Sequence, residues 1–211
     1  MTDPTSTGRA ATTRRYREGD RDALYDVCIR TADNGEDGRG VYQSDEFSGD
    51  IFVGPYLELE PELAFVLDNG ERAVGYCLGT ADTARFVRAH RERWLPRMRE
   101  RYTEPAGPLE TEQDWLLDFL FHPERMDRPE FADSPAHLHI DLLPDYQGAG
   151  HGRRLMAAFL DAAARAGAPA VHLAVATDNT RAIGFYHRLG FQPIEVAGRP
   201  DGVSFLGRST R

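Results

Sequence analysis

A glycine-rich turn directly before an expected helix is the stretch of this sequence best suited to chemistry. The turn reads Gln147-Gly148-Ala149-Gly150-His151-Gly152, and apolar residues at helical spacing follow it from Leu155 to Ala163. Glycines let a ligand approach the backbone closely, and the first N–H groups of a helix have no partner within it. The helix dipole is also positive at this end. The turn therefore predicts an anion site, and we expect the anion to be a phosphate group.

The spacing of the glycines separates the classes of phosphate site. A dinucleotide-binding fingerprint needs GxGxxG and an acidic residue about 20 residues further on, after a second strand. Here the glycines run GxGxG and the acidic partner is missing. A Walker loop needs a Gly-Lys-Ser or Gly-Lys-Thr run, which the sequence lacks. The pattern that fits is Gln-x-x-Gly-x-Gly.

The elements on either side of the turn are those that such a site needs. Residues His137–Leu142 alternate between an apolar and a polar face, as in a half-buried β-strand, and Pro144 ends the alternation. After the helix, Gly167-Ala168-Pro169 provides a stop signal. A second strand is expected at Ala170–Thr177, one βαβ crossover after the first.

A second short helix is expected to follow this strand. Asp178 or Asn179 can cap its start, its apolar residues continue through Tyr186 and Leu189, and Gly190 closes it. The second helix therefore begins, like the first one, at the end of a strand.

These two segments resemble the motifs of the GNAT N-acetyltransferase superfamily. Gln147-x-x-Gly150-x-Gly152 is similar to that family's acyl-coenzyme A motif, and Asn179 and Tyr186 match the residues that flank the thioester there. Because both motifs occur in the family's order and spacing, the chain is identified as a member of this superfamily. The resemblance implies an α/β (α+β) GNAT fold, in which helices flank a mixed, mostly antiparallel central sheet.

The first part of the chain is expected to build the rest of the sheet. A first strand is expected at Arg15–Glu18, a helix at Asp20–Thr31, and a β-hairpin at Leu63–Leu67 and Ala73–Gly79 around an Asn-Gly turn. The stretch Tyr42–Glu60 is expected to be irregular.

An insertion, at about residues 81–135, separates this hairpin from the central strand. It is expected to carry helices at Phe86–Tyr102 and Glu112–Phe121, with Pro96 bending or breaking the first of them. The run from Gly75 to Pro105 is similar to the acetyltransferase-like C-terminal domain of human O-GlcNAcase and to its stand-alone bacterial relatives. This resemblance implies a helical insertion between the third and fourth strands.

Composition and charge limit the remaining possibilities. A polar run predicts a disordered tail at residues 1–13, before a single domain at residues 14–211. The net charge of −9 argues against general affinity for nucleic acid or anionic membrane. Seven arginines within residues 85–101 leave a local nucleic-acid face as an alternative to a solvated helix. No apolar run could span a bilayer, and Cys28 and Cys77 lie in apolar runs, so a cytoplasmic location without a membrane partner is expected.

No metal site is expected. The acidic run that begins at Asp33 is not an EF-hand loop. Gly35 stands at the third position, where that loop needs an oxygen ligand, and Ser44 stands at the twelfth, where it needs a glutamate. A homodimer is compatible with the sequence, which does not specify the oligomeric state.

The resemblance implies acetyl-CoA as the cofactor and an unidentified amine as the acceptor. The N–H groups from Gly148 to Gly152 would hold the pyrophosphate with Arg153 nearby, and the backbone of Leu142 and Leu143 would pair with the pantetheine. The residues implied in cofactor binding are Leu142, Leu143, Gln147, Gly148, Ala149, Gly150, His151, Gly152, Arg153, Asn179 and Tyr186. The human relative has a degenerate cofactor loop, so a non-catalytic acetyl-CoA-binding module is the alternative.

The reaction that the resemblance implies is direct attack of the amine on the thioester. The amine must be neutral to attack, so a base or a water chain is useful. The candidates are His137, His139 and Asp141, which share the polar face of the expected strand. Histidine titrates near neutrality, and desolvation would raise the pKa of Asp141, which lies nearest the expected thioester. Tyr186 matches the family's acid and could protonate the departing thiolate. Each of these side chains could instead make only structural contacts.

Overall fold

The computed structural model describes residues 10–33 and 35–211. Within these residues, strands from both ends of the chain form one seven-stranded sheet. The strands are β1 (Thr12–Arg15), β2 (Phe65–Asp68), β3 (Ala73–Thr80), β4 (Ala136–Leu142), β5 (Ala170–Ala176), β6 (Gln192–Ile194) and β7 (Val203–Ser209). Their order is β1-β2-β3-β4-β5-β7-β6. Only β4 and β5 run parallel, and the other neighbours are antiparallel. The predicted mixed, mostly antiparallel sheet is confirmed.

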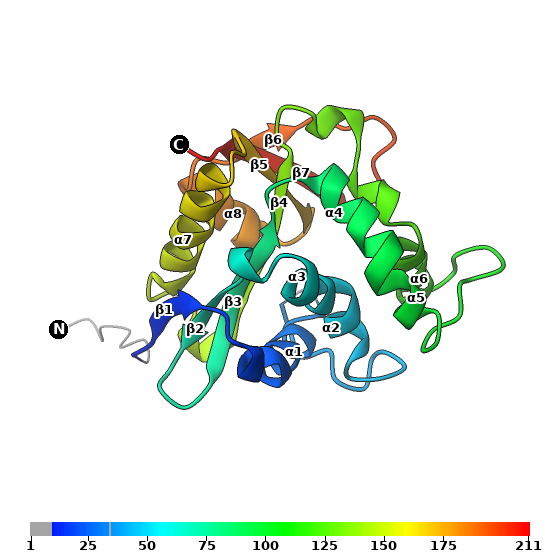
Figure 1. Cartoon of the computed structure of the whole chain (residues 1–211), viewed down its shortest axis with the longest axis horizontal. Helices are drawn as coiled ribbons and strands as arrows, with labels where there is room; N and C mark the ends of the chain where they lie inside the picture. The colour runs from blue at the N-terminus through cyan, green and yellow to red at the C-terminus, as the bar shows by residue number, and fades with distance from the viewer. Residues whose placement is uncertain (1–9, 34) are drawn as a thin grey trace.

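Helices cover both faces of this sheet. They are α1 (Arg21–Ile29), α2 (Phe47–Phe52), α3 (Gly54–Leu59), α4 (Thr83–Ala89), α5 (Leu95–Met98), α6 (Glu112–Phe121), α7 (His151–Arg165) and α8 (Thr180–Arg188). In Figure 1, α7 lies on one side of β2, β3 and β4, while α1, α2 and α3 lie on the other side. The insertion that carries α4, α5 and α6 lies on the side away from α7.

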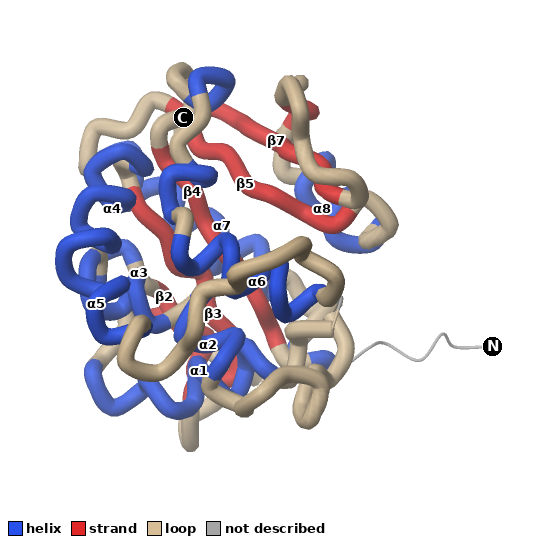
Figure 2. Tube along the Cα trace, turned by 90° about the vertical axis from the view of Figure 1, so that its right-hand side faces the viewer, coloured by secondary structure: helices blue, strands red, loops and turns tan. Residues whose placement is uncertain are grey.

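The parallel pair β4 and β5 separates soon after it forms. Only Ala136 with Val171 and His137 with His172 are paired, although each strand has seven residues. Beyond this point β5 stays paired with β7 and leaves β4, as Figure 2 shows. Because the backbone groups of a strand point alternately to its two sides, the rest of β4 has an edge whose N–H and C=O groups are not paired with β5. The sheet is therefore open beside the second half of β4.

The first strand begins earlier than the sequence predicted. It spans Thr12–Arg15 rather than Arg15–Glu18, and pairs with β2 from Thr12 opposite Asp68. Arg14 fixes this position, because its guanidinium donates to Asp68 at 2.6 Å and to Asp20 at 2.7 Å. The predicted disordered tail, residues 1–13, is therefore wrong for Thr12 and Thr13, and its residues 1–9 lie outside the described residues.

The stretch Tyr42–Glu60 is not irregular as predicted, because it holds α2 and α3. Phe47 and Ile51, one helical turn apart, are both buried, and Pro55 lies in the first turn of α3, where its missing N–H has no cost. Single turns of helix were missed because each is shorter than the window in which helical periodicity can be recognised.

A carboxylate within α2 joins the insertion to the body of the domain. Asp50 is fully buried and accepts hydrogen bonds from Tyr25 at 2.9 Å and from Tyr102 at 2.7 Å. Arg101 pairs with the same carboxylate at 2.6 Å. Trp94 also donates its indole N–H to the Asp50 carbonyl at 3.0 Å. The insertion is thus fixed to α2 by hydrogen bonds as well as by apolar packing.

The long inserted helix is interrupted close to the expected proline. α4 passes into a π-helical turn at His90–Trp94, and Pro96 then lies in the first turn of α5. After the π turn, Pro96 lies in the first turn of α5, where the N–H that proline lacks would have no helical partner. Pro96 therefore interrupts the inserted helix, and the chain continues as a second helix directly after it.

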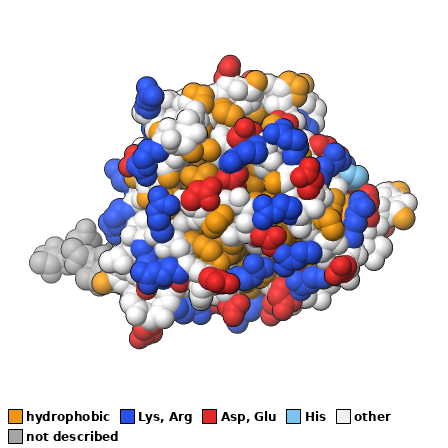
Figure 3. Space-filling view, viewed as in Figure 1, with side chains coloured by type: hydrophobic (Ala, Val, Ile, Leu, Met, Phe, Trp, Pro, Cys, Tyr) orange, Lys and Arg blue, Asp and Glu red, His pale blue; other side chains and the backbone are white. Residues whose placement is uncertain are grey.

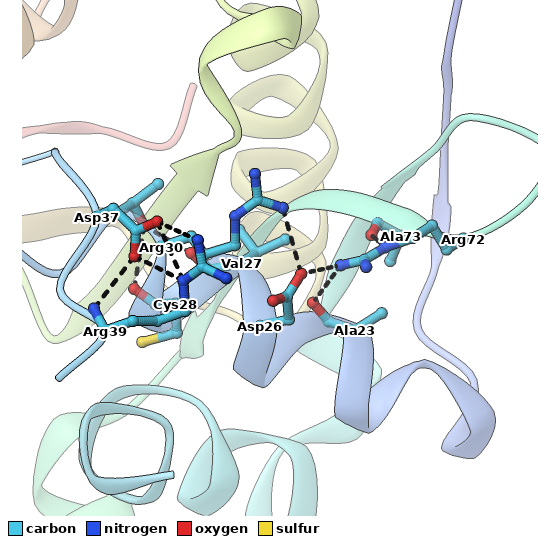
Figure 4. Close-up of polar contacts among 10 residues, drawn as sticks. Ala23, Asp26, Val27, Cys28, Arg30, Asp37, Arg39, Arg72 and Ala73 are labelled. Carbon is cyan, nitrogen blue, oxygen red and sulfur yellow. Dashed lines mark hydrogen bonds and ion pairs between the residues drawn. The ribbon is translucent and has the colours of Figure 1, made fainter. Parts of the chain in front are cut away.

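An ion pair holds α1 to the hairpin that β2 and β3 form. Arg72, the residue before β3, donates to Asp26 of α1 at 2.5 Å, and Arg30 pairs with the same carboxylate, as drawn in Figure 4. Figure 4 also shows Arg39 bound to Asp37 in the loop that follows α1. These contacts keep α1 against the sheet face that carries the polar residues of β4.

Candidate active site

The glycine-rich turn leads into α7 with its helix N-terminus uncapped. Gly148 and Gly150 have φ angles of 79° and 80°, a left-handed conformation that favours glycine. Gly150 is the N-cap residue, and it has no side chain with which to cap α7. Arg153 is exposed in the first turn of the helix. The turn thus places the N–H groups of a helix start and the positive charge of Arg153 at one place.

His151 and Gln147 do not point their polar groups at this turn. The ring of His151 is buried, and its Nδ1 lies 2.7 Å from the guanidinium of Arg154. The amide of Gln147 donates to the carbonyl of Leu142 at 2.8 Å and so ties the turn to the end of β4. Both side chains shape the turn.

The backbone of Leu143 is engaged within the protein, against the expectation that it pairs with pantetheine. Its N–H donates to Val74 at 3.0 Å, and its carbonyl accepts from Tyr146 at 2.9 Å. Because strand backbone groups alternate in direction, the N–H of Leu142 points instead to the side that β5 has left. Of the two residues, Leu142 therefore has the group that an added strand could use.

Gly152 has a packing role that the sequence did not reveal. A Cβ atom at this position would lie 3.2 Å from Cζ of Phe185 on α8, which is closer than side chains normally pack. The absence of a side chain lets the start of α7 lie against α8. Asn179 caps α8, since its side-chain oxygen accepts from the N–H of Ala182 at 3.0 Å. Both motif residues thus position the helix that carries Tyr186.

The three candidate bases have different surroundings. His137 is buried, with Nε2 2.7 Å from the hydroxyl of Tyr56 and Nδ1 2.7 Å from the hydroxyl of Thr83. Burial lowers the pKa of His137 well below its usual value, because the charged form loses its hydration. With both ring nitrogens bonded, His137 has no free lone pair, and its role is structural.

His139 and Asp141 lie on the part of β4 that β5 leaves open, and both are partly exposed. Burial lowers the pKa of His139 to about 4. Burial raises the pKa of Asp141 to about 6, opposed by a hydrogen bond from Tyr76. The carboxylate of Asp141 is therefore the stronger base, and it is still mostly ionised at neutral pH.

Tyr186 is buried, and its phenol remains protonated at neutral pH. Burial is the largest cause of its raised pKa, and the negative charge of Asp141 raises the pKa further. Its ring packs against Phe191, with ring centroids 5.6 Å apart. Tyr186 is thus kept as a proton donor, while Asp141, on the part of β4 that β5 leaves open, is a proton acceptor.

The insertion contributes an aromatic wall on the same side as His139. The ring of Phe52 on α2 lies 5.3 Å from the His139 ring and 6.2 Å from the ring of Phe119 on α6. Trp115, one turn earlier on α6, is 52% exposed. No pattern in the sequence indicates that Phe119 meets Phe52, because that contact depends on how the insertion folds back.

The arginines of the insertion mostly pair with acidic side chains. Arg85, Arg91, Arg97, Arg99 and Arg101 form ion pairs with Glu60, Glu124, Glu58, Glu104 and Asp50. Figure 3 shows positive and negative side chains interspersed on this face. This arrangement is typical of a solvated helical surface.

The described residues, 10–33 and 35–211, contain eight α-helices. None of their helices combines the length and the hydropathy needed to cross a bilayer. Among the same residues, no group of histidine, cysteine and acidic side chains is arranged to hold a metal ion.

Comparisons with known proteins agree with this geometry. The chain is 30% identical to the O-GlcNAcase of Rattus norvegicus over 208 residues, which are 97% of this chain and 23% of the rat protein. It thus spans about a quarter of that curated relative. The solved structure of SsHAT is 51% identical, with a TM-score of 0.90, and covers 96% of this chain and 99% of its own. These matches confirm the predicted similarity to O-GlcNAcase.

Two further findings concern the family. The structure of yncA from Salmonella typhimurium, solved with acetyl-CoA, has a TM-score of 0.54 at 16% identity over 96% of this chain and 95% of that one, which indicates a shared fold. The model of the acetyltransferase (GNAT) family matches residues 31–191. GNAT enzymes use acetyl-CoA as the acetyl donor. This chain belongs to the GNAT acetyltransferase family.

Proposed function

We propose that this protein transfers an acetyl group from acetyl-CoA directly to an amine. The observation that carries the proposal is that Asp141, on the open half of β4, has a pKa raised to about 6, while Tyr186 of the second motif is kept protonated. This gives one group that can accept a proton and one that can donate a proton. A binding module without chemistry would not need both.

The cofactor would enter the opening in the sheet with its pyrophosphate at the start of α7. Backbone N–H groups from Gly148 to Gly152 and the guanidinium of Arg153 favour that charge. The pantetheine would lie beside β4, where the N–H of Leu142 points into the space that β5 has left. The thioester would then lie near Tyr186.

The reaction follows from the protonation states. The ammonium group of the acceptor gives a proton to the Asp141 carboxylate, and the nitrogen lone pair attacks the thioester carbonyl. The attacking nitrogen then releases its second proton to solvent, the tetrahedral intermediate collapses with breakage of the C–S bond, and the thiolate takes the hydroxyl proton of Tyr186. Solvent later returns a proton to Tyr186 and removes the one on Asp141. Asp141 is the base rather than His139, because its pKa is the higher of the two.

The acceptor would approach from the side of the insertion. Phe52 and Phe119 line that side next to His139, and Trp115 extends the aromatic surface outward. We propose an amine whose carbon portion contacts these rings, either a small molecule or the lysine of a protein. The two free cysteines, Cys28 and Cys77, are buried thiols, which supports a reducing compartment such as the cytoplasm.

Calorimetric titration with acetyl-CoA and CoA tests the cofactor site. The wild type is compared with Gly150→Asn and Gly150→Asp, because both residues tolerate the left-handed backbone and a Cβ there meets no atom nearer than 3.7 Å. Binding should survive in the Asn variant and weaken strongly in the Asp variant, whose charge repels the pyrophosphate. Equal affinities in the two variants would contradict the placement of the pyrophosphate.

Turnover is then screened with amines and lysine-containing peptides. All 25 residues counted as lysine or arginine are arginine, so acetyl-lysine in such an assay must come from the acceptor. Acetyl-CoA binding without transfer to any class of amine, and without thioester cleavage, would favour the non-catalytic alternative.

A further inference from the structure

A continuous hydrogen-bond chain leads from the backbone to the ring of His139. It runs from the carbonyl of Pro135 through Thr83, His137 and Tyr56 to His139. The Thr83 hydroxyl lies 2.8 Å from the Pro135 carbonyl and 2.7 Å from Nδ1 of His137. The Tyr56 hydroxyl lies 2.7 Å from Nε2 of His137 and 3.1 Å from Nε2 of His139. We name this the Thr83–His139 chain.

The carbonyl at one end fixes the first two links. A carbonyl can only accept, so the Thr83 hydroxyl hydrogen lies on the bond to Pro135. With the opposite arrangement, two oxygens would face each other at 2.8 Å without a hydrogen between them. The Thr83 oxygen must then accept from His137, so Nδ1 of His137 carries its hydrogen.

The remaining links follow in turn. His137 is buried and its pKa is depressed, so its ring is neutral and Nε2 has a lone pair. That lone pair accepts the hydroxyl hydrogen of Tyr56. The Tyr56 oxygen can then accept from His139, which places the hydrogen of His139 on Nε2.

The consequence is a lone pair at Nδ1 of His139. His139 is also neutral, because burial lowers its pKa to about 4. No described residue donates to Nδ1, and this atom is not among the buried polar atoms that lack a partner, so it lies on the accessible side of the ring. The ring thus presents an acceptor, not a donor, next to Asp141.

We propose that the Thr83–His139 chain holds Nδ1 of His139 as a hydrogen-bond acceptor for an N–H group of the incoming amine. This role rests on the proposed acetyl transfer. A primary amine keeps two N–H bonds after it has given a proton to Asp141, and donation of one of them to His139 would aim the nitrogen lone pair. Thr83, His137 and Tyr56 are positioning residues, since they act through His139.

Nitrogen-15 NMR of histidine-labelled protein tests the assignment without any acceptor. His137 should carry its hydrogen on Nδ1, and His139 should carry its hydrogen on Nε2. Thr83→Val keeps the shape of the side chain but removes the hydroxyl, so the chain should reverse. His137 would then donate from Nε2 to Tyr56, Tyr56 would donate to His139, and Nδ1 of His139 would become a donor. Thr83→Ser restores the hydroxyl and should restore the wild-type pattern.

The kinetic result follows from this reversal. In Thr83→Val the KM for the amine should rise roughly ten- to hundredfold, as expected for one hydrogen bond replaced by two opposed donors, while acetyl-CoA affinity stays unchanged. Thr83→Ser should recover most of the loss. A wild-type His137 with its hydrogen on Nε2 would overturn the assignment, and so would a Thr83→Val variant with an unchanged KM. Wild-type protein with the expected tautomers but no transfer to any amine would overturn the proposed function instead.

Discussion

The hydroxyl of Tyr76 on β3 donates to Oδ2 of Asp141 on β4 over 2.5 Å. The two residues are direct partners in the antiparallel register of these strands, so the sheet itself sets the position of the carboxylate. Tyr76 is fully buried, and its raised pKa keeps it a hydrogen donor. Burial raises the pKa of Asp141 and this hydrogen bond lowers it, which together give a base suited to neutral pH.

The first prediction concerns the pH dependence of transfer. Because the folded-state pKa of Asp141 is raised to about 6, its carboxylate is ionised above that pH and protonated below it. We expect kcat to rise with pH through about 6 and then to level off. Asp141→Asn should lower kcat by roughly 10²- to 10⁴-fold and remove this inflection. A variant that keeps the inflection would assign it to another group.

The second prediction concerns Tyr76. In Tyr76→Phe the carboxylate of Asp141 loses a hydrogen bond that stabilises its charged form, so its pKa should rise above about 6. Carbon-13 NMR of aspartate-labelled protein measures this titration without a substrate. Asp141→Asn serves as the control, because the resonance that titrates should be absent from it. A pKa that is unchanged or lower in Tyr76→Phe would contradict this view of the pair.

The third prediction separates the acid role of Tyr186 from packing. Tyr186→Phe keeps the ring that contacts Phe191 and removes only the hydroxyl. We expect kcat to fall by roughly a hundredfold or more, with the Kd for acetyl-CoA unchanged, because the hydroxyl acts on the departing thiolate. The effect should be smaller for thioester analogues with a more acidic leaving thiol. Equal loss with every leaving group would argue for a packing role.

The sequence predicted the site more completely where chemistry depends on neighbours along the chain. The turn before α7, the cap at Asn179 and the alternation of His139 and Asp141 are local patterns, and the structure has each of them. The partners that tune them, Tyr56 and Tyr76, come from other elements. Their contacts depend on strand register and on helices too short to show a period, so no local pattern identified them.

Leu143 illustrates the same limit. The family resemblance implied that its backbone pairs with pantetheine, but a turn and a neighbouring strand use its carbonyl and its N–H. Such competition for backbone hydrogen bonds is decided by the tertiary fold.

The fourth prediction concerns the attachment of the insertion. Asp50→Ala would remove the shared acceptor of Tyr25, which is half-buried, and of Tyr102, which is buried. We expect the free energy of unfolding to fall by about 3–5 kcal/mol, measured by denaturant titration. Asp37→Ala is the matched control, because Asp37 pairs with Arg39 at the exposed surface and its loss should change little. Similar effects of the two substitutions would show that Asp50 is not a structural link.

The last prediction concerns the aromatic wall that α2 and α6 form next to His139. Trp115 is 52% exposed on α6, so its removal should have little effect on stability. We expect the acceptor to pass from Trp115 along the rings of Phe119 and Phe52 to His139. Trp115→Ala should then raise the KM for the acceptor several-fold and leave the Kd for acetyl-CoA unchanged. Val41→Ala provides the control, because Val41 is also a large exposed apolar residue, at 55% exposure. An equal rise in KM in both variants would point to a general surface effect. No rise in Trp115→Ala, for acceptors of any size, would place the acceptor's path away from α6.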